Sequence, residues 1–416
     1  MEKLKNKIYN LLKWSEQHTA TDMIYLARGG FWLTLGQIVS AASSFILAIA
    51  FANLLPKETF GLYKYVLSIV GILAISTLPG INTAIIQAVA RGYEGSFMPS
   101  LKTKIQFGFL GGLLSLFLAL YYYLNDNNNL ALLFMIPGFF IPFMDSLSLY
   151  NYFLQGQKNF RSSTIYGIVS FTGVSVFLIL VLFVTKNIFL ITLAYFLLWT
   201  LFRLFFLIVT LRRFPPKEEK TEETISYGKH LTLMDLFPLI AQQLDKILIF
   251  HYLGPVQLAV YNFAIAVPEQ IKAPFKNLKL LILLRFSVRE TEEIKMGLLG
   301  KILKMSGILI GVVLIYFFIA PFLYKLFFPQ YLESIFYSRI FALSIIFTSA
   351  ILPLSFLQSK LAIKELYRFN ALRAVFQIIL LFVLIYYFGI IGAVVSRISA
   401  DFLNLAVLIF LAKKLK

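Results

Sequence analysis

The sequence predicts an all-α polytopic membrane protein with about twelve transmembrane helices, arranged as two six-helix lobes around a central cavity. Three observations predict this fold class: the composition, the regular spacing of long apolar segments, and one hydrophilic stretch near the middle of the chain. Hydrophobic residues make up 59% of the 416 residues and charged residues 14%, and the mean hydropathy is +0.81. A soluble domain is about 45–50% apolar and about 25% charged. It has too little interior to bury this much apolar surface, so we expect lipid to be the solvent.

Twelve apolar segments are long enough to cross a membrane, which takes about 20 mostly apolar residues. The predicted spans are 30–54, 62–90, 106–125, 130–154, 162–184, 188–211, 230–253, 258–280, 302–324, 333–357, 367–387 and 390–412. The hydrophilic stretch 212–229 separates the first six spans from the last six. We therefore expect an N-lobe over 29–211, a cytoplasmic linker over 212–229 and a C-lobe over 230–416.

The first 28 residues form an amphipathic segment of another kind. Leu11, Leu12 and Trp14 are interspersed with lysines, and no early apolar core or small-residue cleavage site follows. This pattern predicts a helix lying on the cytoplasmic membrane surface over residues 1–28 and no cleaved signal peptide.

The basic residues predict the orientation. With the N-terminus inside, 27 of the 38 Lys and Arg residues fall in cytoplasmic segments, and only Lys57, Lys186 and Lys325 fall in outer loops. Short cytoplasmic loops carry such an excess, so both termini are predicted to be cytoplasmic in a multi-pass protein of the inner or plasma membrane. The same distribution accounts for the net charge of +18. A nucleic-acid binder would gather its basic residues on one water-facing surface, so we expect no nucleic-acid partner.

The two halves of the chain resemble one another. The segment that begins Leu55-Pro56 and ends at Tyr63 aligns without gaps to the segment that begins Leu253-Gly254 and ends at Tyr261, an offset of 198 residues. Each segment follows the first predicted span of its half. Because six spans precede the second copy, the repeats have the same orientation, which predicts a pseudo-twofold axis along the membrane normal.

Thirteen charged residues of the predicted spans are set apart from those counted with the loops. Each would cost about 2.5–3.5 kcal/mol at the centre of an isolated inserted helix, so each must face a partner or a wet cavity. The basic members are Lys64, Arg203, Lys246, Lys272, Lys276, Arg339, Arg373 and Arg397. The acidic members are Asp145, Asp235, Asp245, Glu269 and Asp401. Some are expected to be structural ion pairs or to reach the interface, but the excess of three bases favours an anionic cargo over a cationic one.

The spacing of two sets of these charged residues predicts which of them share a helix face. Glu269, Lys272 and Lys276 follow the i, i+3, i+7 pattern of one helix face, with Glu269 about 16 Å from the outer end of its span. Arg397 and Asp401 are four residues apart, and their predicted role is a salt bridge with each other.

The motifs of familiar enzymes are missing from the sequence. It has no cysteine, three widely separated histidines, and no phosphate loop, nucleophile elbow or HExxH motif. We therefore expect no catalytic residue, metal site or cofactor. A membrane glycan polymerase or ligase is the alternative of another class, but it would be expected to carry a sizeable outer loop, which the predicted topology lacks.

Several short motifs occur in an order that resembles a known family. In the first half they are Arg28-Gly29-Gly30-Phe31-Trp32 with Gln37, Leu54-Leu55-Pro56 with Phe60-Gly61-Leu62-Tyr63, and Pro79-Gly80-Ile81-Asn82. In the second half they are Tyr227-Gly228, Gln243-Leu244-Asp245-Lys246, and Leu253-Gly254 with Tyr261. The ordered set resembles the polysaccharide transporter branch of the multidrug/oligosaccharidyl-lipid/polysaccharide flippase superfamily, over essentially the whole chain.

The resemblance implies a flippase that moves undecaprenyl-diphosphate-linked oligosaccharide to the outer leaflet by alternating access, for surface polysaccharide biosynthesis. It implies that Arg28 lines the cytoplasmic mouth of the cavity, and that membrane lipids and polysaccharide polymerase machinery are partners. The alternative within the superfamily is a multidrug or cation antiporter, whose sites depend on membrane acids. Four carboxylates are candidates for H⁺ or Na⁺ coupling: Asp145, Asp245, Glu269 and Asp401.

The predicted topology can be tested with single cysteines, because the chain contains none. A cysteine at Asn127 is expected to react with an impermeant maleimide in intact cells, and one at Glu219 only after lysis. The reverse labelling pattern would contradict the predicted orientation.

Overall fold

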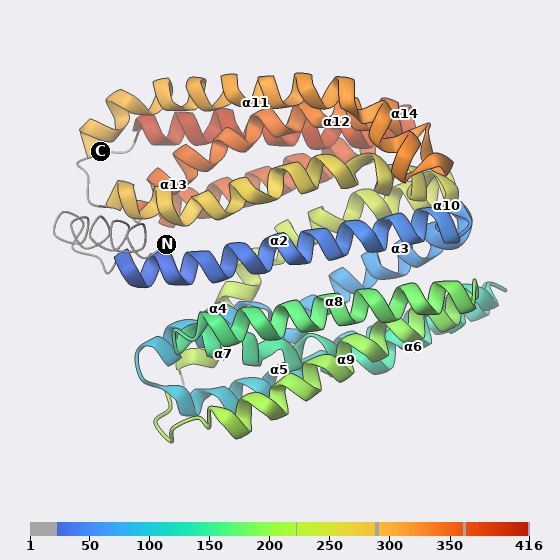
Figure 1. The fold of residues 1–416 in the computed structure, drawn as a ribbon, viewed down its shortest axis with the longest axis horizontal. Helices are drawn as coiled ribbons and strands as arrows, with labels where there is room; N and C mark the ends of the chain where they lie inside the picture. Colours follow the sequence, from blue (N-terminus) through green and yellow to red (C-terminus); the bar gives the residue numbers. More distant parts are fainter. Residues whose placement is uncertain (1–22, 222, 288–290, 361–362, 415–416) are drawn as a thin grey trace, which may run out of the picture.

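The computed structural model describes residues 23–221, 223–287, 291–360 and 363–414, and these form helices and short connections without a strand (Figure 1). The helices of the first half are α2 (Met23–Leu54), α3 (Lys57–Leu73), η1 (Ala74–Thr77), α4 (Gly80–Ala90), η2 (Glu94–Ser96), α5 (Phe97–Leu124), α6 (Asn128–Met144), η3 (Ser146–Ser148), α7 (Leu149–Gly156), α8 (Phe160–Val184) and α9 (Ile188–Arg213). Those of the second half are α10 (Glu223–Ser287), α11 (Thr291–Phe327), η4 (Pro329–Tyr331), α12 (Ser334–Ala342), η5 (Leu343–Ala350), α13 (Ile351–Ser359) and α14 (Ile363–Lys414). Among the described residues, ten helices are long and apolar enough to cross a membrane.

Two of these ten, α10 and α14, are helical hairpins. The backbone of α10 leaves helical geometry at Gly254, with φ of 86°, and that of α14 does so at Gly389, with φ of 57°. The Tyr261 hydroxyl donates to the Asp245 carboxylate at 2.5 Å, whereas in a straight helix these residues would be about 24 Å apart. Glycine takes the left-handed conformation without a Cβ clash. Each hairpin therefore supplies two antiparallel spans, and the prediction of about twelve spans is confirmed.

Two equivalent spans are interrupted by 3-10 turns. In the first half η3 separates α6 from α7, and in the second half η5 separates α12 from α13. Adding the offset of 198 to Ser146, the first residue of η3, gives Ser344, which lies in η5. The interruptions thus fall at matching places, which agrees with the internal repeat seen in the sequence.

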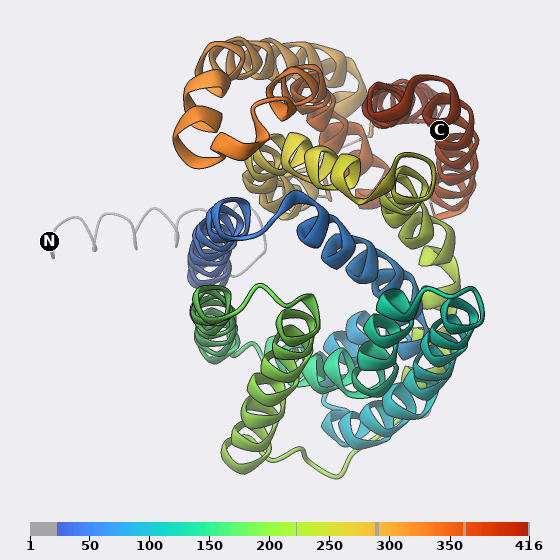
Figure 2. The same cartoon turned by 90° about the vertical axis from the view of Figure 1, so that its right-hand side faces the viewer.

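The two halves of the chain form two groups of helices that lie one above the other in Figure 2. Helix α10 packs along α3 and α4 of the first half. Glycines allow this close approach: a Cβ on Gly61 would lie 1.9 Å from the Pro255 carbonyl oxygen, and one on Gly80 would lie 2.3 Å from the Gly228 carbonyl oxygen. Because Gly61 is near the predicted outer end and Gly80 is nearer the other end, this seam follows much of the predicted membrane depth.

The halves also meet at the end that is predicted to face outward. Lys57 and Glu333 form an ion pair there, and the Asn53 side-chain amide donates to the Phe327 carbonyl at 3.0 Å. The rings of Phe60 and Phe263 stack with centroids 4.9 Å apart. These contacts join the halves at the predicted outer end.

The predicted domain boundaries can be compared with the places where the described helices begin and end. Met23 and Lys414, the ends of the described chain, lie at the same end of the bundle in Figure 1. The predicted linker 212–229 is helical at both ends, because α9 continues to Arg213 and α10 begins at Glu223. Residues 1–22 lie outside the described residues, so the amphipathic segment stays a prediction, as do the lobe boundaries.

Gly61→Ala is expected to lower the free energy of unfolding by about 1–3 kcal/mol, because the new methyl group would overlap backbone atoms of Pro255. Gly307→Ala is the matched control, since no heavy atom outside its own stretch of helix lies within 4 Å of the Cβ position. Thermal melting of the purified protein in detergent measures both. Equal melting temperatures for the two variants would contradict the close seam.

Candidate functional site

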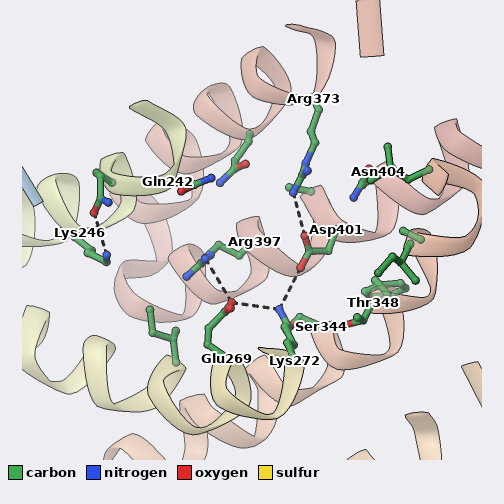
Figure 3. Close-up of a pocket in the computed structure, with 18 residues that line it drawn as sticks. Gln242, Lys246, Glu269, Lys272, Ser344, Thr348, Arg373, Arg397, Asp401 and Asn404 are labelled. Atoms are coloured by element: carbon green, nitrogen blue, oxygen red, sulfur yellow. Dashed lines mark hydrogen bonds and ion pairs between the residues drawn. The ribbon is translucent and has the colours of Figure 1, made fainter. Parts of the chain in front are cut away.

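A cavity of about 570 Å³ lies inside the second half (Figure 3). Its lining comes from α10, η5, α13 and α14. Six of the lining residues are ionisable, four basic and two acidic: Lys246, Lys272, Arg373, Arg397, Glu269 and Asp401. The cavity therefore has a formal excess of two positive charges.

The ionisable groups alternate in sign along one connected chain. The Glu269 carboxylate lies 3.6 Å from Arg397 and 3.4 Å from Lys272. Lys272 Nζ lies 3.4 Å from Asp401, and the other Asp401 oxygen lies 3.4 Å from Arg373. Figure 3 shows these contacts running through the centre of the cavity, between the two hairpins. Each carboxylate is thus held between two bases.

Asp245 anchors one end of this chain behind the cavity wall. It is only 1% exposed, and it lies 3.6 Å from Arg397. The Tyr261 hydroxyl and the Lys246 backbone N–H donate to its two oxygens, at 2.5 Å and 2.8 Å. A carboxylate without water needs such donors and a cation. Asp245 therefore fixes the position of the Arg397 guanidinium.

The predicted pair of Arg397 and Asp401 does not form. Arg397 contacts Asp245 and Glu269, both on α10, and Asp401 contacts Lys272 and Arg373. The reason is tertiary: α10 and α14 are adjacent hairpins, so charges on facing helices lie closer than the i, i+4 neighbour. Glu269 and Lys272, which the spacing placed on one helix face, lie 3.4 Å apart.

A second charged cluster lies in the first half, apart from this cavity. Asp145 accepts a hydrogen bond from Thr77 at 2.7 Å and contacts Lys104 at 3.3 Å. Arg203 donates to the Met144 carbonyl and lies over the ring of Trp199. The structure therefore separates Asp145 and Arg203 from the candidates of the second half.

Lys104 was not among the predicted site residues, although its side chain is 0% exposed. The predicted span begins at residue 106 and left Lys104 in a cytoplasmic loop, whereas α5 begins at Phe97. A predicted span that began at Phe97 would have placed Lys104 inside the membrane.

Arg339 lies away from the cavity lining, and two other candidates have no described side chain. Arg339 points to α11, where it donates to the Phe317 carbonyl at 2.9 Å and lies over the Phe317 ring. The side chains of Arg28 and Lys276 lie outside the described ones. Their assignment to the cavity stays a prediction.

All four candidate coupling carboxylates have basic neighbours. Asp145 contacts Lys104, Asp245 contacts Arg397, and the other two belong to the alternating chain. Within the described residues, no group of three or more His, Asp and Glu side chains is arranged to hold a metal ion.

Neutral polar side chains complete the cavity, and none of them was among the predicted site residues. They include Gln242, Gln243, Thr348, Gln377 and Asn404. Lys246 Nζ donates to the Gln243 amide oxygen at 3.0 Å. Arg373 Nε and Asn404 Oδ1 are buried without a hydrogen-bond partner among the described residues. The site thus has polar atoms that a ligand or water can satisfy.

A comparison with protein families matches more than half of the chain. The family described as "polysaccharide biosynthesis protein" matches residues 26–268. This covers the first half, the α10 turn and the start of the cavity lining. A comparison with curated proteins gives no match.

Solved structures show the same fold. One is an outward-facing multidrug resistance MATE family transporter of the MOP superfamily, 15% identical, with a TM-score of 0.61 and coverage of 92% of this chain and 94% of that one. A MATE transporter in complex with MaD5 has 14% identity, a TM-score of 0.64 and coverage of 94% of each chain. A MOP superfamily transporter from Pyrococcus furiosus has 15% identity, a TM-score of 0.57 and coverage of 92% and 94%. At these identities the likeness shows the fold alone.

Arg397→Gln is expected to lower the free energy of unfolding by about 3–5 kcal/mol, because it leaves the buried Asp245 carboxylate without its cation. The double variant Asp245→Asn with Arg397→Gln is expected to recover much of that loss, since no charge then stays buried and unpaired. Thermal melting of both purified variants checks this. Additive losses would show that the two residues stabilise the protein independently.

Proposed function

Because the chain belongs to the polysaccharide biosynthesis protein family, we propose that it moves an undecaprenyl-diphosphate-linked oligosaccharide from the cytoplasmic to the outer leaflet for surface polysaccharide biosynthesis. The chain is a multi-pass membrane transporter of the MOP superfamily, with the fold of MATE transporters. The lipid-linked cargo, the inner or plasma membrane and the cytoplasmic termini are parts of the proposal.

The observation that carries the proposal is the net positive charge of the side chains that line the cavity. Four basic side chains face it against two acidic ones. A diphosphate presents several acceptor oxygens with two or more negative charges, and it would form charge-assisted hydrogen bonds with Lys and Arg. The buried Arg373 Nε adds a donor without a partner among the described residues. The saccharide and the polyprenyl chain would extend from this point.

A multidrug or cation antiporter is the rival of the same fold. An organic cation would meet two excess positive charges, and the cavity carboxylates already contact bases. The Pyrococcus furiosus transporter is described as having a binding pocket of reverse polarity that suggests a different function. By the same reasoning, the polarity of the cavity here favours an anionic cargo.

The contacts between the halves fit loading from the cytoplasm. The ion pair of Lys57 with Glu333 and the stacked rings of Phe60 and Phe263 join the halves at the predicted outer end. Alternating access would require these contacts to break while the halves move about the glycine seam. The opposite end would be the entrance for cargo made in the cytoplasm.

Lys272 is the base at the centre of the alternating chain, so Lys272→Ala is expected to reduce surface glycan at least tenfold while protein abundance stays near normal. Lys272→Arg is expected to keep part of the function, because the charge persists although its geometry changes. Arg339→Ala is the control, since Arg339 contacts α11 and not the cavity. Immunoblots of surface polysaccharide and of membrane protein measure both quantities. A fully active Lys272→Ala variant would exclude a role for this lysine in cargo binding.

The class of transporter has its own test in liposomes. The purified protein is expected to make an undecaprenyl-diphosphate-linked oligosaccharide accessible from the opposite leaflet. Transport of a cationic dye without movement of the glycan lipid would instead identify an antiporter.

A further inference from the structure

We propose that Glu269 and Asp401 are internal counterions that hold the two phosphate positions of the cavity while no cargo is bound. The cargo diphosphate would replace them, and they would return when it leaves. This inference rests on the proposed function, because it concerns how the same cavity treats an anionic cargo.

The geometry of the alternating chain carries the inference. Glu269 lies between Arg397 and Lys272, and Asp401 lies between Lys272 and Arg373. Lys272 Nζ is 3.4 Å from both carboxylates. The result is two anionic groups that share a central cation and are each flanked by an arginine. A diphosphate likewise presents two linked anionic groups, so its phosphates match the two positions that the carboxylates occupy.

The cavity also contains places to which the carboxylates can move. The neutral lining residues Gln242, Gln377, Thr348 and Asn404 offer amide and hydroxyl donors beside the chain. Moreover, the contacts of 3.4–3.6 Å are longer than an optimal charge-assisted hydrogen bond. Asp245 differs, because Tyr261 and the Lys246 backbone N–H hold it at 2.5 Å and 2.8 Å. We therefore assign the exchangeable role to Glu269 and Asp401 and a fixed one to Asp245.

Lys246 has a separate part in this exchange. Its Nζ donates to the neutral amide oxygen of Gln243, and it takes part in none of the ion pairs of the alternating chain. It can attract an incoming anion before any ion pair opens. Lys272, Arg373 and Arg397 then exchange their contacts with Glu269 and Asp401 for contacts with the phosphates.

Internal counterions have a consequence for the transport cycle. Without Glu269 and Asp401 an empty carrier would return with four bases balanced by Asp245 alone, which is unfavourable within the membrane. With them it returns with two fewer net positive charges. The carrier would therefore complete its cycle without taking an anion back, and net movement of cargo would not depend on exchange.

Equilibrium binding to the purified full-length protein in detergent tests the replacement. The probes are geranylgeranyl diphosphate and geranylgeranyl monophosphate. Glu269→Gln and Asp401→Asn are each expected to lower the Kd for the diphosphate about tenfold, because each removes a competitor for the bases. Asp235→Asn is the matched control: it removes one negative charge from an exposed position on α10 and should change the Kd less than twofold.

Two results would overturn the inference. One is a diphosphate Kd that rises or stays constant in both folded variants, which would make Glu269 and Asp401 purely structural partners of the bases. The other needs no variant: wild-type protein is expected to bind the diphosphate at least tenfold more tightly than the monophosphate, and equal affinities would exclude two matched positions.

A transport assay tests the consequence for the cycle and separates this inference from the proposed function. In liposomes, the wild-type rate for a polyprenyl-diphosphate-linked saccharide is expected to change less than twofold when the same lipid is present in the opposite leaflet. The Glu269→Gln, Asp401→Asn double variant is expected to need that opposite lipid, with a rate about tenfold lower in its absence. Wild-type protein that moves no such lipid would overturn the proposed function. Wild-type activity with a double variant that is equally fast in both conditions would overturn only the counterion role.

Discussion

An ionised side chain inside a membrane must find an opposite charge, hydrogen-bond donors or water, and this constraint governs the structure. The clearest instance is Asp245, whose carboxylate is 1% exposed and is held by Arg397, Tyr261 and the Lys246 backbone N–H. These partners come from three of the four legs of two hairpins, so satisfying one carboxylate fixes the hairpins relative to one another. The cavity beside them follows from that placement.

The hairpins themselves depend on two glycines. At Gly254 and Gly389 the chain reverses within a single residue of positive φ, so the two legs of each hairpin stay in contact at the outer end. A longer loop would let the legs separate and would weaken the pairing of Tyr261 with Asp245. Glycine also allows the first half to approach α10, as at Gly61 and Gly80. The same residue type therefore shapes both the second half and the contact between the halves.

The two halves share a helical plan but use their charges differently. Within its predicted spans the first half holds one carboxylate, Asp145, with the fully buried Lys104 close to it. The second half holds a row of alternating charges along a cavity. A compact pair suits a fixed structural role, whereas a row of weakly held pairs suits exchange with a charged ligand. On this view the repeat has kept its fold while its halves have acquired separate roles.

The sequence by itself determined the fold class, the span count and the excess of positive charge within the spans, because each depends on composition and on the length of apolar segments. It also indicated the break at Gly254, since the repeat placed that glycine between two spans. It could not decide which charges meet. Helical spacing suggested that Arg397 would pair with Asp401, yet each pairs across to other legs, and Lys104 lay outside the predicted span. Pairing depends on which faces of distant helices come together, and only the tertiary packing of the hairpins decides that.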